Sequence, residues 1–156
     1  MRRLIVLALL LLASPALAQF WGHYANARFG YAIDIPPGYA GQGESDNGDG
    51  QVFTRLSAEQ RLTVWGGYFL ESFEAEVADR VVLVGAENWS VSYQASTPQW
   101  AVLSGQRDHR IFSQRMIALC DGAGFAAYRV EYNIGDLADM DAVIEGLNRS
   151  FVPVGC

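Results

Sequence analysis

Short apolar segments separated by turn residues follow one another through most of this chain, and this succession restricts the possible folds more than any other feature. Residues 29–35 alternate apolar and polar side chains up to Pro36, which is typical of a strand with one buried face. Runs of strands joined by short turns imply an antiparallel sheet. Further strands are expected at residues 51–57, 61–70, 89–95, 99–104, 110–119 and 124–133.

Two other segments have the periodicity of helices. Ser72 is suited to cap the first helix, and Gly85 to end it. The second helix is expected to begin at Asp136, with apolar side chains at positions 140, 143, 144 and 147. This order of elements predicts an α+β domain, in which two main helices pack on an antiparallel sheet of about six to seven strands.

The first eighteen residues have the three parts of a signal peptide. Arg2 and Arg3 precede an apolar stretch at 4–13, and Ala18 ends an A-x-A cleavage site. Ten apolar residues are too few for a membrane-spanning helix, which needs roughly 20. We therefore expect cleavage after Ala18, a single globular domain over residues 19–156 with no membrane span, and a periplasmic or secreted location.

The charge of the chain argues against two classes of partner. Without Arg2 and Arg3, the 11 basic residues become 9 against 17 acidic ones, a formal net charge of −8. Nucleic acids and anionic membrane surfaces are bound through clusters of basic side chains, and here the arginines are scattered. All the basic residues are arginine, so no lysine chemistry is available.

The chain contains two cysteines, Cys120 and Cys156. In an oxidising compartment an even number of cysteines indicates a disulfide. A metal pair and a free thiol are the alternatives, but two cysteines without neighbouring histidines make a poor zinc site. A disulfide that pins the C-terminus would stabilise the fold by roughly 4 kcal/mol in the chain-entropy model.

Two segments carry a resemblance to a known family. The aromatic-rich strand FGYAIDIPPGY at 29–39 and the late helix AVIEGLNRSF at 142–151 resemble the PsbP-like superfamily. This family includes the extrinsic subunit P of photosystem II, Mog-type Ran-binding proteins and small bacterial envelope proteins. The resemblance implies an α/β/α sandwich and a binding or assembly role, but it transfers no functional residue, and photosystem and Ran roles are not expected.

Catalytic patterns are weak in this sequence. There is no G-x-S-x-G motif, and His23 and His109 are the only histidines. Adjacent side chains on a strand or turn point apart, so Asp108 cannot orient His109. Sugar hydrolysis by a pair of carboxylates remains an alternative. Asp34 and Glu131 are the acids most expected to be buried.

Two groups of residues are candidates for binding. The acidic, glycine-rich segment at 38–50 predicts a surface loop, which could hold calcium or simply form a turn. Its spacing does not match an EF-hand, and we expect no metal. The possible binding loop consists of Glu44, Asp46, Asn47 and Asp49, and the possible aromatic surface of Trp21, Tyr24 and Tyr39.

These features predict an exported, non-catalytic binding or scaffolding protein without a cofactor. Its partner would be an envelope protein or a small molecule. An inhibitor or immunity-type protein against a secreted enzyme is the first alternative, because an acidic loop can enter a basic cleft. An envelope-sugar hydrolase is the second alternative.

Overall fold

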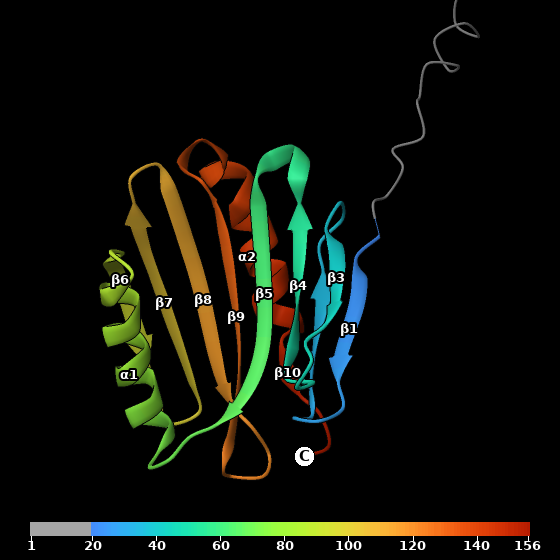
Figure 1. Cartoon of the computed structure of the whole chain (residues 1–156), viewed down its shortest axis with the longest axis vertical. Coiled ribbons are helices and arrows are strands. Elements are labelled where there is room, and N and C mark those ends of the chain that lie inside the picture. The colour runs from blue at the N-terminus through green and yellow to red at the C-terminus, as the bar shows by residue number, and fades with distance from the viewer. Residues whose placement is uncertain (1–19) are drawn as a thin grey trace, which may run out of the picture.

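The computed structural model describes residues 20–156 (Figure 1). The predicted signal peptide, residues 1–18, lies outside this range. In chain order the described elements are β1 (Gly22–Asn26), β2 (Tyr31–Ile35), β3 (Ala40–Glu44), β4 (Gly50–Arg55), β5 (Gln60–Tyr68), α1 (Phe73–Ala86), β6 (Ser90–Ser96), β7 (Trp100–Arg107), β8 (Arg110–Ala118), β9 (Gly124–Asn133), α2 (Leu137–Ser150) and β10 (Val152–Pro153), with short 3-10 turns at Leu56–Ala58 and Ile134–Asp136.

A seven-stranded antiparallel sheet forms the centre of the domain, in the order β3-β4-β5-β9-β8-β7-β6. This confirms the predicted α+β class. A second, three-stranded sheet, β1-β2-β10, was not predicted. One expectation was wrong here, because the predicted loop at 38–50 contains β3. β1 lies before residue 29, where no strand was expected. Nearly all of β1 and the whole of β3 are at least partly exposed, so neither has a buried apolar face that the sequence would reveal.

The side chains of β9 alternate between two apolar layers on opposite faces of the sheet. Tyr128 and Val130 point into the layer that also contains residues of α2 and β2. Phe125 and Ala127 point to the opposite face, where they pack with residues of α1. The two helices therefore cover opposite faces of the large sheet, and the small sheet lies on the same face as α2 (Figure 1).

Helix α1 covers only one end of the sheet face on which it packs. Phe73 and Val77 pack with Ala101 of β7 and Met116 of β8, and α1 lies beside β6 (Figure 1). Within residues 20–156, no helix covers the same face of β4 and β3 (Figure 1). The boundary between the covered and uncovered parts is where the candidate site lies.

Candidate functional site

A groove of about 430 Å³ lies between α1 and the strands β5, β9 and β8. The sheet register builds its floor: Thr63, Arg129 and Gln114 are directly opposite one another on β5, β9 and β8. We call this hollow the α1 groove. Its floor consists of Arg61, Thr63, Trp65, Gln114, Arg129 and Glu131, and its wall of Arg80, Leu83, Val84 and Glu87.

Local sequence signals position the helical wall. The Ser72 hydroxyl accepts a hydrogen bond from the Ala75 N–H at 3.1 Å and so caps α1, as predicted. Buried Val84 anchors the last turn on the sheet. Asn88 then adopts φ +63°, a left-handed conformation that asparagine tolerates better than most residues, and turns the chain into β6. Glu87, at the end of the helix, is thereby held at the groove.

Arg129 is the central charge of the α1 groove. Its side chain is only 13% exposed, and its Cζ lies 4.5 Å from the ring centroid of Phe112 and 4.9 Å from that of Trp89. Its Nη1 is 3.3 Å from Glu87 Oε2, and its Nε is 3.1 Å from Glu131 Oε1. Aromatic rings beneath the guanidinium and two carboxylates beside it stabilise this buried charge.

Some hydrogen-bond donors on the floor of the α1 groove have no acceptor among the described residues. Arg129 Nε and Nη2, and Gln114 Nε2, are buried without a hydrogen-bond partner. The Nε of Arg129 is close enough to Glu131 for an ion pair, but its N–H does not point at the carboxylate oxygen, so the distance alone does not satisfy it. A buried unsatisfied donor lowers the stability of a fold by about 1–3 kcal/mol, so these donors destabilise the α1 groove.

Both carboxylates of the α1 groove are engaged with Arg129. Glu87 and Glu131 both form ion pairs with the same guanidinium. A sugar hydrolase needs two acids at one site. The pair named from the sequence is not assembled at one hollow, because Asp34 lines a different one, beside Trp21. The arrangement is suited to binding a polar ligand.

The predicted binding loop is a hydrogen-bonded turn. Glu44 accepts hydrogen bonds from the Tyr24 hydroxyl at 2.8 and 2.9 Å, and Asp49 accepts from the Ser45 hydroxyl at 2.6 Å and from Asn47 Nδ2 at 3.0 Å. Asp46 is exposed. Within residues 20–156 no three acidic, histidine or cysteine side chains come together in a way that could hold a metal ion. A role of this loop in binding stays a prediction.

The loop and the α1 groove belong to one surface. A second hollow of about 340 Å³, between β3, β4 and β5, is lined by Ser45 and Asp49 of the loop and by Gln42. It also contains Thr63 and Trp65, which line the α1 groove. The two hollows therefore meet at these two side chains, and the acidic loop lies at the far end of the uncovered sheet face.

The three predicted surface aromatics lie in different surroundings. Trp21 packs against Gly146 of α2, where an added Cβ would be 2.7 Å from Trp21 Cζ2. Tyr24 packs edge-on against Phe53, with ring centroids 5.6 Å apart, and its hydroxyl reaches the loop at Glu44. Tyr39 donates a hydrogen bond to Gln60 at 2.9 Å. Of the three, Tyr24 is the one joined to the acidic loop by a hydrogen bond.

Because the pKa of Tyr39 is raised, we expect the protein to lose stability at alkaline pH. Burial raises the pKa of Tyr39 from 10.0 to about 12, with Arg55 opposing and Asp136 adding to the shift. The unfolded chain loses this proton first, so stability is fully present below about pH 10 and is lost as the pH rises to about 12. In denaturant unfolding followed across this range, Tyr39→Phe is expected to show a smaller fall of the midpoint than the unchanged protein. An equal fall in both proteins would contradict this assignment.

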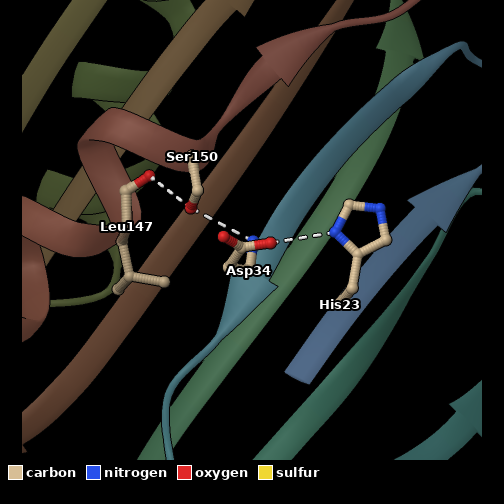
Figure 2. A network of polar contacts seen from close by, with 4 residues as sticks. All are labelled: His23, Asp34, Leu147 and Ser150. Carbon is tan, nitrogen blue, oxygen red and sulfur yellow. Dashed lines mark hydrogen bonds and ion pairs between the residues drawn. The ribbon is translucent and has the colours of Figure 1, made fainter. Parts of the chain in front are cut away.

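A polar contact network joins the small sheet to the end of α2 (Figure 2). His23 Nδ1 is 2.9 Å from Asp34 Oδ1, and the backbone N–H of Asp34 donates to Ser150 Oγ at 3.1 Å. The Ser150 hydroxyl donates to the Leu147 carbonyl at 3.4 Å. A catalytic triad places histidine between serine and carboxylate, whereas here Asp34 lies between the other two. The network fastens β1 and β2 to the last turn of α2.

Sequence reasoning named Glu131 but not Arg129, Gln114 or Glu87 as site residues. Arg129 and Gln114 are polar residues in the middle of strands, which the sequence alone places on an exposed face. These two residues form a site because the strand register places them opposite each other and α1 forms a wall beside them. The sequence did contain one indication of this site, because each of two successive long strands has a polar residue near its centre.

Comparisons with known proteins identify the fold. No family model matches the chain, and no curated protein sequence matches it. The solution structure of cyanobacterial PsbP (CyanoP) from Synechocystis sp. PCC 6803 is similar, with a TM-score of 0.67 and 13% identity over 90% of this chain and 96% of that one. The crystal structure of the Ran-binding protein Mog1p from Saccharomyces cerevisiae has a TM-score of 0.64 and 8% identity, over 88% and 97% of the two chains. The chain therefore has a PsbP-like fold.

Proposed function

We propose that this chain is a non-catalytic binding protein of the periplasm and that it binds its ligand in the α1 groove. The observation that carries the proposal is the groove itself, with buried donors on its floor that no other described residue satisfies. Its volume of about 430 Å³ is within the range of small-molecule sites, and it also accommodates a side chain of a protein partner.

The similar folds support a binding role by analogy. Mog1p is described as a Ran-binding protein, so this architecture can present a protein-binding surface. For the present chain the partner we propose is an envelope protein or a small molecule, because the signal-peptide pattern of residues 1–18 directs it out of the cytoplasm.

One feature of the described residues supports export. Cys120 and Cys156 form a disulfide, the kind of bond that oxidising compartments preserve. Neither described helix has the length and apolar character needed to cross a membrane.

A pair of neighbouring variants tests the groove. Leu83 lines it, whereas Val82, the preceding residue on α1, is 71% exposed and does not. The mature protein and its Leu83→Trp and Val82→Trp variants are used to capture components of their own cell envelope. Proteins and small molecules are both read by mass spectrometry. We expect at least one component to be retained by the unchanged and Val82→Trp proteins and about tenfold less by Leu83→Trp, because the indole fills the groove.

The result decides the proposal directly. If no component distinguishes Leu83→Trp from Val82→Trp, the α1 groove is not the binding site. If the component is a secreted enzyme that the protein inhibits, the binding function takes the form of an inhibitor.

A further inference from the structure

Three of the buried donors without a partner meet at one position of the α1 groove. They are Arg129 Nε and Nη2 and Gln114 Nε2. The two residues are directly opposite each other on β9 and β8, and Gln114 is only 3% exposed. Elsewhere in residues 20–156 there is one further buried side-chain atom of this kind, Arg115 Nε. Since the great majority of buried polar atoms are hydrogen-bonded, three at one point indicate a missing acceptor.

The geometry of the guanidinium defines that acceptor. The N–H groups on Nε and Nη2 form one edge of the planar group, which matches two oxygens of a carboxylate or a phosphate. Nη1 is on the other side, and it is the atom bonded to Glu87. The free edge of Arg129 is therefore the one that forms two parallel hydrogen bonds to an oxyanion.

Two charged neighbours control access to this edge. Glu131 lies 3.1 Å from Nε without a hydrogen bond, and its side chain is 28% exposed, so it has room to turn towards solvent. Arg61 is opposite Glu131 in the sheet register, is exposed, and forms no ion pair within the described residues. Its charge favours an anion at the mouth of the groove of an otherwise acidic protein.

We propose that the Nε–Nη2 edge of Arg129 and the amide of Gln114 form a binding site for an oxyanion, a carboxylate or phosphate group of the ligand. The inference rests on the proposed function, because it names the chemistry recognised in the same groove. The oxyanion takes the place of the Glu131 carboxylate beside Nε and supplies acceptors to Nη2 and to Gln114. Glu131 thus competes with the ligand.

The test uses the side-chain N–H signals of the folded protein in NMR spectra. Succinate and inorganic phosphate are titrated separately. We expect a saturable shift of the Arg129 Nε–H and Gln114 amide signals with at least one of them. A response to succinate alone assigns a carboxylate ligand, and a response to phosphate alone assigns a phosphorylated one. If neither anion moves these signals, the proposed site is wrong.

Variants with opposite expected effects separate binding from folding. Glu131→Gln removes the competing charge and should tighten anion binding by about fivefold. Glu145→Gln, in the exposed ion pair with Arg149 on α2, is the matched control without effect. Gln114→Leu should weaken binding by about tenfold and yet raise Tm by a few degrees, because a buried unsatisfied amide is removed. Equal affinities in Glu131→Gln and Glu145→Gln would overturn the proposal.

The two proposals fail in different ways. Loss of envelope capture in Leu83→Trp together with no response to either anion would retain groove binding and reject the oxyanion site. Anion shifts at Arg129 together with envelope capture that is independent of Leu83 would retain the oxyanion site and reject the proposed function.

Discussion

Reduction of the disulfide between Cys120 and Cys156 is expected to lower the free energy of unfolding by about 2–4 kcal/mol. The bond closes a loop with a sequence separation of 36, and its Cα atoms are 5.3 Å apart. It joins the turn after β8 to the end of the chain. Besides the disulfide, the tail is held by the two register pairs of β10 with β2 and by the hydrogen bond from the Val154 N–H to the Gly30 carbonyl at 2.7 Å.

Denaturant unfolding with and without reductant measures this effect. The double variant Cys120→Ser/Cys156→Ser should unfold at the midpoint of the reduced protein, and reductant should not shift it. Protein recovered from the periplasm is expected to begin at Gln19 and to have a mass two hydrogens below the reduced value. An unchanged midpoint after complete reduction would show that the bond does not restrain the unfolded chain. Envelope capture through the α1 groove should survive reduction, because Cys120 and Cys156 line a different hollow.

The fold was predictable where burial leaves a pattern in the sequence. β9 begins and ends at the predicted residues, and α1 starts after the predicted cap at Ser72. β3, with the sequence AGQGE, is exposed along its whole length, so no alternation marks it, and its glycines indicate a loop. β1 forms because it pairs with β2 over five residues as a hairpin, and its short, largely exposed sequence GHYAN has no apolar alternation that would mark it as a strand.

The candidate site was less predictable because it is a property of the sheet register. Arg129 and Gln114 are 15 positions apart in the sequence, and Glu87 is farther still. Their meeting depends on which residues of β8 and β9 are opposite each other and on where α1 lies. A shift of one residue in the register between β8 and β9 would place these two side chains on opposite faces of the sheet. Glu131 was expected to be a buried acid and is 28% exposed, but its partner Arg129 could not be known from the sequence.

Gly50→Ala is expected to lower the free energy of unfolding by about 3 kcal/mol. Gly50 is opposite Trp65 in the register of β4 and β5. A methyl group there would collide with the Val64 carbonyl oxygen and lie 2.7 Å from Trp65 Cα. Both are backbone atoms of a central strand, so no side chain can turn away to make room. The start of β4 would have to separate from β5.

This separation would also disturb the acidic loop. The Gly50 carbonyl accepts a hydrogen bond from the Ser45 N–H at 2.8 Å, and the Asp49 carbonyl accepts one from the Gly66 N–H at 2.8 Å. Gly85→Ala is the matched control, because its Cβ would meet nothing within 4 Å on α1, and it should raise stability by up to about 1 kcal/mol. Both variants are compared by denaturant unfolding. Equal stability of Gly50→Ala and the unchanged protein would contradict the close approach of β4 to β5, and with it the hollow that joins the loop to the α1 groove.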